Sequence, residues 1–207
     1  MSKTFSCFVL FAGFFVLCSL IDLFEQTQVG PKLVHNIARW DGSMWQAMTD
    51  DECRRQCTHI KGESICEDRN CELGGPVTAL ASMGATVYAA GMFSSAGGRP
   101  ARNLARYFLG FWRPVLGGVD GSVFDLKVLS LESLPPFSHF QSGILDVDCL
   151  YVAGDLKSVI DGDGTAQKIQ GLARVCPDGG KWSMVHGTEN LGPVLALHVP
   201  AKGSREV

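Results

Sequence analysis

The sequence lacks any tract dense in Lys or Arg, and its formal net charge is only -3 at pH 7. Binding to nucleic acid or to acidic lipid needs a concentrated positive surface, so both are excluded as partners. The GxSxG, HExxH, P-loop and GxGxxG motifs are also missing from any strand–turn–helix context, which leaves hydrolase, protease and nucleotide-dependent chemistry without support. We therefore predict no catalytic residue, no metal and no cofactor.

Glycine, in contrast, is abundant. The chain has 24 glycines, and they fall between short apolar runs. Glycines in these positions are typical of tight turns between strands, and they favour an all-β protein. With 46% hydrophobic residues, the 207-residue chain can form one sizeable core.

The N-terminal residues 1–24 differ in kind from the rest. Lys3 precedes an uncharged stretch over residues 4–21 that contains five Phe, which predicts a hydrophobic targeting helix separate from the fold. Val16 and Cys18 are small enough for signal-peptide cleavage before Ser19, and an uncleaved signal anchor that tethers the protein through residues 4–21 is the alternative. Either reading makes residues 25–207 secreted, or membrane-anchored with the repeat region extracellular or lumenal.

Six cysteines remain beyond the leader, an even number that predicts disulfides in an exported chain. They are Cys53, Cys57, Cys66, Cys71, Cys149 and Cys176. The first four lie in a polar insert, residues 49–74, that is too charged to form a core without such bridges. A zinc site is the competing interpretation, but the spacing C-x3-C-x8-C-x4-C lacks paired C-x2-C knuckles.

The bridge Cys149–Cys176 is predicted from strand positions. Cys149 opens one expected strand and Cys176 closes the next, and such ends meet in an antiparallel pair. The four cysteines of the insert must then pair among themselves, with the connectivity left open.

Internal repeats are the most informative feature of the chain. NIARWDGSMW at 36–45, NLARYFLGFW at 103–112 and GLARVCPDGGKW at 171–182 align with one another. The repeated residues are Arg39, Arg106 and Arg174, at intervals of 67 and 68, and Trp45, Trp112 and Trp182, at intervals of 67 and 70.

Two further families of segments fill the space between these repeats. PVTALA at 76–81, SVFDLKV at 122–128 and PVLALHV at 193–199 form one, and VYAAGMF at 87–93 and LYVAGDL at 150–156 form the other. Their alternation or continuous apolarity predicts strands. Together with the strands of the Arg/Trp repeats they predict four-stranded antiparallel blades, about two to three in number, in an open or incomplete β-propeller. The chain would enter in the middle of a blade, near residue 36, and leave after one strand that ends near residue 199.

The segments NIARWDGSMW and VYAAGMFSSAGGRPARNLARY resemble the repeats of extracellular propellers related to kelch and to the galactose-oxidase central domain, and in particular the cell-polarity cortical-marker family. The resemblance implies a rigid, surface-presented scaffold that binds proteins or glycans. The copper chemistry of galactose oxidase does not carry over, because the three tyrosines are accounted for by strand positions. The third repeat departs from the pattern at residues 155–158.

Three sets of residues invite a ligand-binding interpretation. Asp161 and Asp163 in DGDG resemble part of a calcium loop, but too few acidic positions are present and a solvated turn is favoured. The repeated arginines offer a stripe for acidic glycans, although edge-strand protection or a salt bridge to a neighbouring blade is favoured. The repeated tryptophans are expected to pack within blades rather than to form a sugar platform.

The function predicted from these features is a non-catalytic, extracellular or membrane-attached interaction scaffold with a protein or glycan partner. The alternative is a fragment of a secreted carbohydrate-active propeller enzyme whose catalytic residues lie elsewhere. Fewer than three complete blades do not close a ring, so we expect either a longer parent chain or self-association with a second copy.

Overall fold

The computed structural model describes residues 5–10, 15–20, 27–29, 32–34, 36–41, 43–55, 58–60, 63–65, 71–129, 148–176, 180–185, 187–188 and 191–198. Within these stretches, side chains are described in the ranges 36–53, 71–129 and 148–198. The elements are β1 (Phe5–Leu10), β2 (Phe15–Leu20), β3 (Thr27–Val29), β4 (Lys32–Val34), β5 (Ile37–Trp40), β6 (Trp45–Ala47), α1 (Asp51–Arg55), β7 (Thr58–Ile60), β8 (Glu63–Ile65), β9 (Val77–Met83), β10 (Thr86–Gly91), β11 (Ser95–Ala96), β12 (Arg99–Pro100), β13 (Leu104–Phe108), β14 (Phe111–Pro114), β15 (Gly118–Leu129), β16 (Cys149–Ile160), β17 (Ala166–Lys168), β18 (Leu172–Val175) and β19 (Trp182–Met184).

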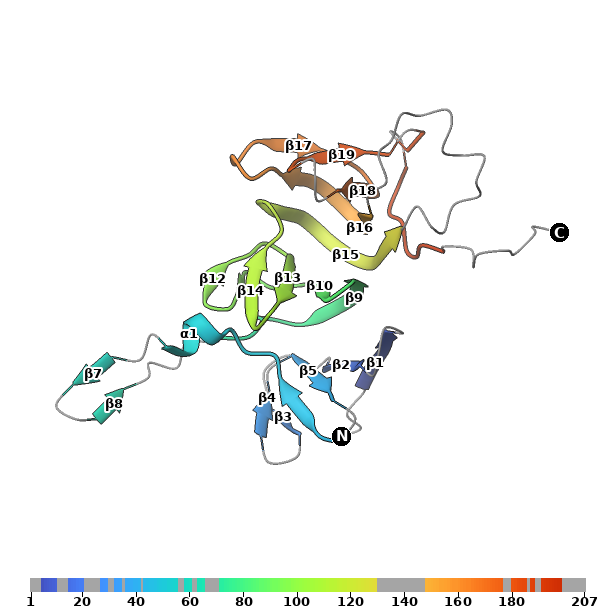
Figure 1. The fold of residues 1–207 in the computed structure, drawn as a ribbon. Helices are drawn as coiled ribbons and strands as arrows, with labels where there is room; N and C mark the ends of the chain where they lie inside the picture. Colours follow the sequence, from blue (N-terminus) through green and yellow to red (C-terminus); the bar gives the residue numbers. More distant parts are fainter. Residues whose placement is uncertain are drawn as a thin grey trace.

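Three antiparallel sheets follow one another along the chain. The first sheet has the order β1-β2-β5-β6, the second β9-β10-β13-β14, and the third β15-β16-β18-β19 with β17 paired to β16. The second sheet lies between the other two, and none of the sheets closes on itself (Figure 1). The expected all-β class is therefore confirmed, whereas the arrangement as propeller blades stays a prediction.

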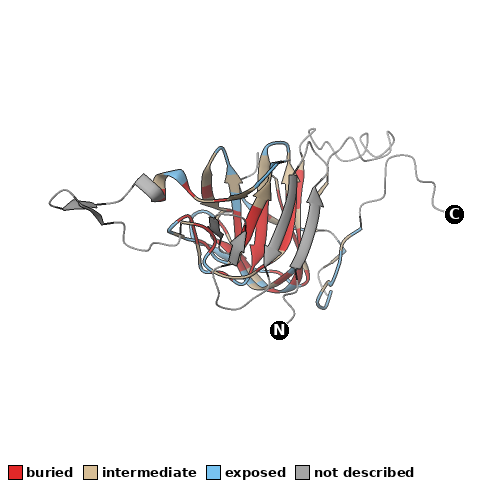
Figure 2. Cartoon of the chain, turned by 90° about the horizontal axis from the view of Figure 1, so that it is seen from below, coloured by how far each residue is buried: buried red, intermediate tan, exposed pale blue. Residues whose placement is uncertain are grey.

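The second sheet is buried on both faces, as its apolar sequence predicts. Tyr88 and Ala90 of β10 belong to the core shared with the third sheet, and Ala89 between them belongs to the core shared with the first sheet. Ala89 and Ala90 are both 0% exposed, and such small side chains let the flanking sheets approach closely. Buried residues accordingly fill the middle of the molecule in Figure 2.

A glycine marks the same repeat position in two sheets. A Cβ atom on Gly91 of β10 would overlap the Pro76 carbonyl oxygen, and one on Gly154 of β16 would overlap the Ser122 carbonyl oxygen. The pairing with the first strand of the sheet shifts register next to each glycine. The repeated glycine thus permits a bulge at which two backbones pass within contact distance.

The N-terminal segment is a strand hairpin where the sequence predicts a helix. Strands β1 and β2 pair with each other, and β2 pairs with β5, so that residues 5–20 supply the first two strands of the first sheet. The expected entry of the chain in mid-sheet is therefore wrong. Short apolar runs are ambiguous between helix and strand, and the unpaired backbone of β5 offers an edge that a strand can satisfy.

The C-terminal segment also differs from expectation. No strand is assigned over the described residues 191–198, although the sequence predicts one at 193–199. The segment nevertheless lies against the third sheet, because the Val194 N–H donates to the Gly154 carbonyl at 3.1 Å and the Leu197 N–H donates to Asp125 Oδ2 at 2.8 Å. A strand assignment needs a regular ladder of backbone hydrogen bonds, and of these two contacts one is to a side chain.

The Cys-rich insert forms helix α1 and the hairpin β7–β8, which projects away from the three sheets (Figure 1). A disulfide joins Cys53 and Cys71 with their Cα atoms 5.5 Å apart. Cys57 and Cys66 lie outside the described residues. The expected disulfide between Cys149 and Cys176 is present, with a Cα–Cα distance of 4.3 Å, and it joins the start of β16 to the residue after β18.

Candidate interaction surfaces

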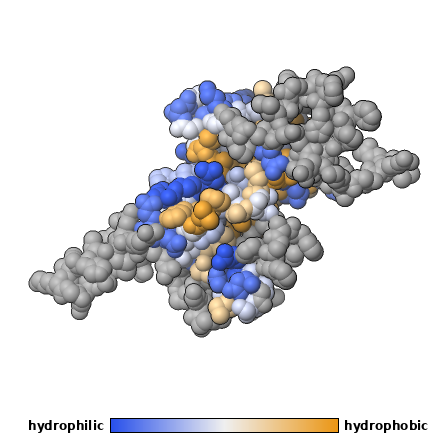
Figure 3. Space-filling view, in the orientation of Figure 1, coloured by the Kyte–Doolittle hydropathy of each residue, from blue (hydrophilic) through white to orange (hydrophobic). Residues whose placement is uncertain are grey.

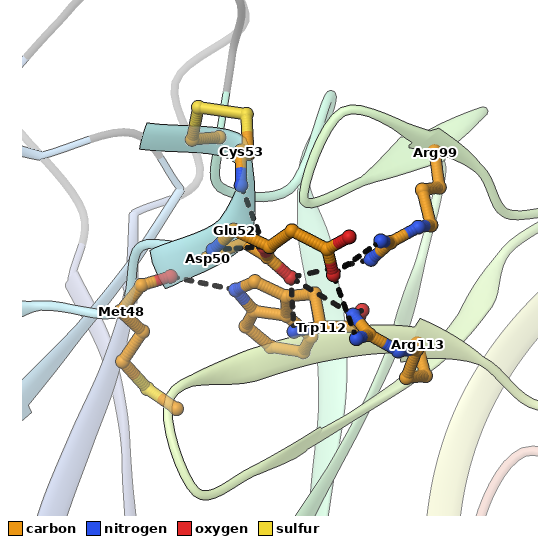
Figure 4. The surroundings of a disulfide bond; sticks show 8 residues. Met48, Asp50, Glu52, Cys53, Arg99, Trp112 and Arg113 are labelled. Carbon is orange, nitrogen blue, oxygen red and sulfur yellow. Dashed lines mark hydrogen bonds and ion pairs between the residues drawn. A yellow bond between two sulfur atoms is a disulfide. The ribbon is translucent and has the colours of Figure 1, made fainter. Parts of the chain in front are cut away.

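A buried carboxylate fixes the insert to the second sheet (Figure 4). Asp50 is 0% exposed; its Oδ1 accepts the N–H of Glu52 at 3.0 Å and of Cys53 at 2.9 Å, and its Oδ2 accepts the N–H of Trp112 at 2.8 Å. The Trp112 indole N–H donates to the Met48 carbonyl at 2.6 Å. One carboxylate therefore caps the start of α1 and holds β14 in place.

Two arginines complete this network. Arg113 lies 3.2 Å from Asp50 and 3.1 Å from Glu52, and Arg99 lies 3.7 Å from Asp50 and 2.6 Å from Glu52. The hydrogen bond from Arg99 is the largest cause of a lowered pKa for the Glu52 carboxyl. Two acidic and two basic groups neutralise one another, so the network presents no net charge to a ligand.

The third sheet repeats the carboxylate–tryptophan contact. Asp161, 3% exposed, accepts the N–H of Trp182 at 2.8 Å with Oδ1 and the side-chain amide of Gln167 at 2.5 Å with Oδ2. The Trp182 indole N–H donates to the Ile160 carbonyl at 3.0 Å. Asp161 is thus a buried structural acceptor rather than part of a solvated turn, and both of its oxygens are already engaged.

The neighbouring Asp163 is an ordinary turn residue. Its Oδ1 accepts the Thr165 N–H at 2.9 Å, and this bond is the largest cause of the lowered pKa of its carboxyl. Within the described part of the chain, no group of three or more His, Cys, Asp or Glu side chains is arranged to hold a metal ion.

In the first two repeats an asparagine joins the sheet to the chain that follows it. Asn36 and Asn103 precede β5 and β13 with φ of 61° and 58°. The Asn36 amide donates to the Leu73 carbonyl at 2.8 Å, and the Asn103 amide donates to the carbonyls of Val119 and Gly121 at 3.2 Å each. Asparagine is among the few residues that tolerate this left-handed conformation, which aims its side chain at the next sheet.

The repeated arginines lie on the inner strands β5, β13 and β18, so edge-strand protection is not their role. Arg39 donates to Gln46 at 2.5 Å and Arg174 donates to Ser183 at 3.0 Å, in each case across to the last strand of the same sheet. Arg106 is exposed and lies opposite Arg113 in the register. These two hydrogen bonds lie within a sheet, and the charge of Arg39 also acts on Tyr107 of the second sheet, where it lowers the pKa that burial raises.

The repeated tryptophans pack as expected in two of three cases. Trp112 is 0% exposed and Trp182 3% exposed, so neither offers a face to a sugar. Trp45 is half-buried, and its ring lies 5.4 Å from that of Trp40.

The turn between the last two strands of a sheet is polar in the first repeat and apolar in the second. In the first, Asp41 Oδ1 accepts the N–H groups of Ser43 and Met44, both at 2.9 Å, and these bonds lower the pKa of the carboxyl to about 2. In the second, Phe108 and Leu109 occupy the positions of Asp41 and Gly42.

The apolar turn has an unusual conformation and exposure. Phe108 is 45% exposed and Leu109 is 72% exposed, and Leu109 has a φ of 48°. A β-carbon in this left-handed region costs about 1–2 kcal/mol, which glycine would avoid. The turn therefore exposes two large hydrophobic side chains at a cost in stability. Figure 3 shows hydrophobic residues next to hydrophilic ones in the middle of the described surface.

A groove of about 790 Å³ lies where the second sheet meets the third. Its lining is mixed, with Met92, Phe93, Pro100, Pro114 and Leu116 as apolar members and Arg102 as a charged one. Met92 is 64% exposed, and the Arg102 side chain is exposed as well. The volume is in the range of pockets that hold small ligands or a few side chains of a partner.

Sequence reasoning identified the repeated tryptophans and the Cys149–Cys176 pair but missed the carboxylates that hold the tryptophans. Asp50 lies at the start of the insert, whereas Asp161 lies between the second and third strands of its own sheet, so the two do not align in the repeats. The exposed turn could have been found, because Phe-Leu stands where the first repeat has Asp-Gly.

No protein-family model, curated protein or solved structure matches this chain. Among the described residues, no helix has the length and apolarity needed to cross a membrane.

Proposed function

We propose that this chain is a non-catalytic, extracellular or membrane-attached interaction scaffold built of propeller-type repeats. The observation that carries the proposal is the repetition itself: three successive antiparallel sheets have their main strands in chain order, and in the second and third a buried carboxylate accepts the tryptophan N–H. Asp50, Asp161 and Asn103 all bond to backbone groups, and the two carboxylates also accept hydrogen bonds from the side chains of Arg113 and Gln167. Such a framework holds surface loops rigidly, which suits binding a protein or a glycan.

Export is part of the proposal. The disulfides Cys53–Cys71 and Cys149–Cys176 fit an oxidising compartment, and residues 1–24 carry the lone Lys3 and the apolar run of a targeting segment. If the leader is cleaved before Ser19, β1 and most of β2 leave with it, and β5 becomes an open edge for pairing.

The test of location is expression of the full chain in a secretory eukaryotic cell. We expect the protein in the medium or at the cell surface, with no cysteine available to an alkylating reagent before reduction. Intact-mass measurement determines whether the leader is present. Cytosolic protein with alkylated Cys149 and Cys176 would contradict the export proposal.

The test of function is binding of the purified, disulfide-bonded protein to arrays of extracellular glycans and of protein ectodomains. We expect saturable binding that disappears on reduction and unfolding, with no turnover of glycoside substrates. Hydrolysis that co-purifies with the folded chain would favour the alternative, a piece of a carbohydrate-active enzyme.

A further inference from the structure

The turn over residues 108–111 is chemically unlike its counterpart in the first sheet. Asp41 stabilises that counterpart by accepting two backbone N–H groups, whereas Phe108 at the same position can accept none. Leu109 adopts a left-handed conformation at a position where the first repeat has glycine. A strained, exposed, apolar turn in place of a self-stabilised polar turn is what a contact surface requires and a free surface does not.

A groove on the same chain is chemically similar to this turn. The groove between the second and third sheets is concave and partly apolar, with Met92, Phe93 and Leu116 in its lining. Its exposed Arg102 is opposite in charge to the exposed Asp51, whose carboxylate lies against Gly110 of the turn. Turn and groove are therefore complementary both in apolarity and in charge.

We propose that this protein self-associates by inserting Phe108 and Leu109 of one copy into the groove lined by Met92 and Leu116 of a second copy. Because turn and groove are different surfaces, the contact is heterologous and the pair of copies keeps one free turn and one free groove. The assembly then grows head to tail. This contact goes beyond the proposed function, since it does not depend on which protein or glycan the scaffold binds.

The sequence itself supplies the turn variant for the test. Phe108→Asp with Leu109→Gly restores the residue pair of the first repeat and relieves the left-handed leucine, so the variant should unfold at the same or a higher urea concentration than the wild type. The groove variant is Met92→Glu, at a side chain that is 64% exposed and whose replacement leaves the core intact. The matched control is Met44→Ser, which removes a different exposed apolar side chain, 54% exposed, from the turn of the first sheet.

The measurement is sedimentation velocity of the purified, disulfide-bonded full chain from low to high micromolar concentration. We expect the wild type and Met44→Ser to form species larger than a dimer, and the turn and groove variants each to weaken association by at least tenfold. An equimolar mixture of the two defective variants should form a complex of one copy of each and stop there, because only one intact turn and one intact groove remain.

Three results would overturn the proposal. They are a wild type that stays monomeric at high micromolar concentration, a turn variant that associates as tightly as the wild type, and a mixture of variants that forms no complex. Sedimentation with phosphatidylcholine vesicles, lost in the turn variant while the wild type stays monomeric in solution, would instead assign the turn to lipid. Binding to glycan or ectodomain arrays by a monomeric wild type would leave the proposed function standing while this contact fails.

Discussion

Asp50 and Asp161 perform one task at two unrelated places in the sequence. Each is almost fully buried, and each accepts the backbone N–H of the tryptophan in the last strand of a sheet. An ionised acceptor makes a stronger bond to a backbone N–H than a neutral one does, and a buried N–H left without an acceptor carries a penalty. The two carboxylates therefore fix the last strands of the second and third sheets in place.

Replacing Asp50 by alanine should lower the free energy of unfolding by about 3 kcal/mol, since it strands buried N–H groups and removes the partner of two arginines. Asp161→Ala should cost about 2 kcal/mol, because no arginine depends on that carboxylate in the described contacts. Urea unfolding measures both. Asp120→Ala, at an exposed position of β15, is the control and should change stability by less than about 0.5 kcal/mol. Equal stability of all three variants would contradict this account.

Asp41 gives a prediction about pH. Hydrogen bonds from Met44 and Ser43 lower its pKa from 3.8 to about 2, so its contribution is present above pH 4 and is lost as the pH falls toward 2. The stability difference between wild type and Asp41→Asn should accordingly shrink between pH 4 and pH 2. A difference that stays constant across this range would show that the carboxylate is not hydrogen-bonded as described.

At the scale of elements, alternation and repetition predicted the strands well. β10, β15 and β16 lie where continuous or alternating apolar residues indicated strands, and β16 continues through the departure at residues 155–158. The N-terminal hairpin was not predicted, because five Phe in an apolar run fit a helix in a membrane and a strand at an open edge equally well. The paired strand expected at 193–199 needs a neighbour that the sequence pattern alone does not supply.

The repeated glycines allow the bulges in the second and third sheets. Gly91→Ala and Gly154→Ala should each destabilise the protein by about 2 kcal/mol or more, because the added methyl group meets backbone that cannot move aside. Gly84→Ala is the control: its methyl group meets nothing within 4 Å, and its φ of 55° alone should cost about 1 kcal/mol. Thermal or urea unfolding distinguishes the two outcomes, and a larger loss at Gly84 would refute the close-approach explanation.

The two disulfides should stabilise different parts of the molecule. Removing Cys149–Cys176 with serine substitutions opens a loop with a sequence separation of 27 and should lower global stability by about 3.5 kcal/mol. Removing Cys53–Cys71 should loosen mainly the insert, since Asp50 and its partners still hold the start of α1. Amide hydrogen exchange would show the difference. Equal loss of protection throughout the second sheet in both variants would contradict it.

At the scale of the whole molecule, the second sheet is the centre of the structure. It shares one core with the first sheet and another with the third, and neighbouring residues of β10 point into the two cores in turn. The same strand order on either side makes the molecule a row of similar units, in which each unit gains its stability from its neighbours. Which surface of that row meets a partner depends on departures from the repeat, such as Phe108 and Leu109.

The units are proposed to be successive propeller-type blades, and a crystal structure of the purified, disulfide-bonded chain tests this most directly. It should show the second and third sheets superimposing strand for strand, with Trp112 and Trp182 at one position and β9 and β15 side by side around a common axis. Sheets of different strand order, or two sheets packed face to face as a sandwich without a common axis, would contradict it.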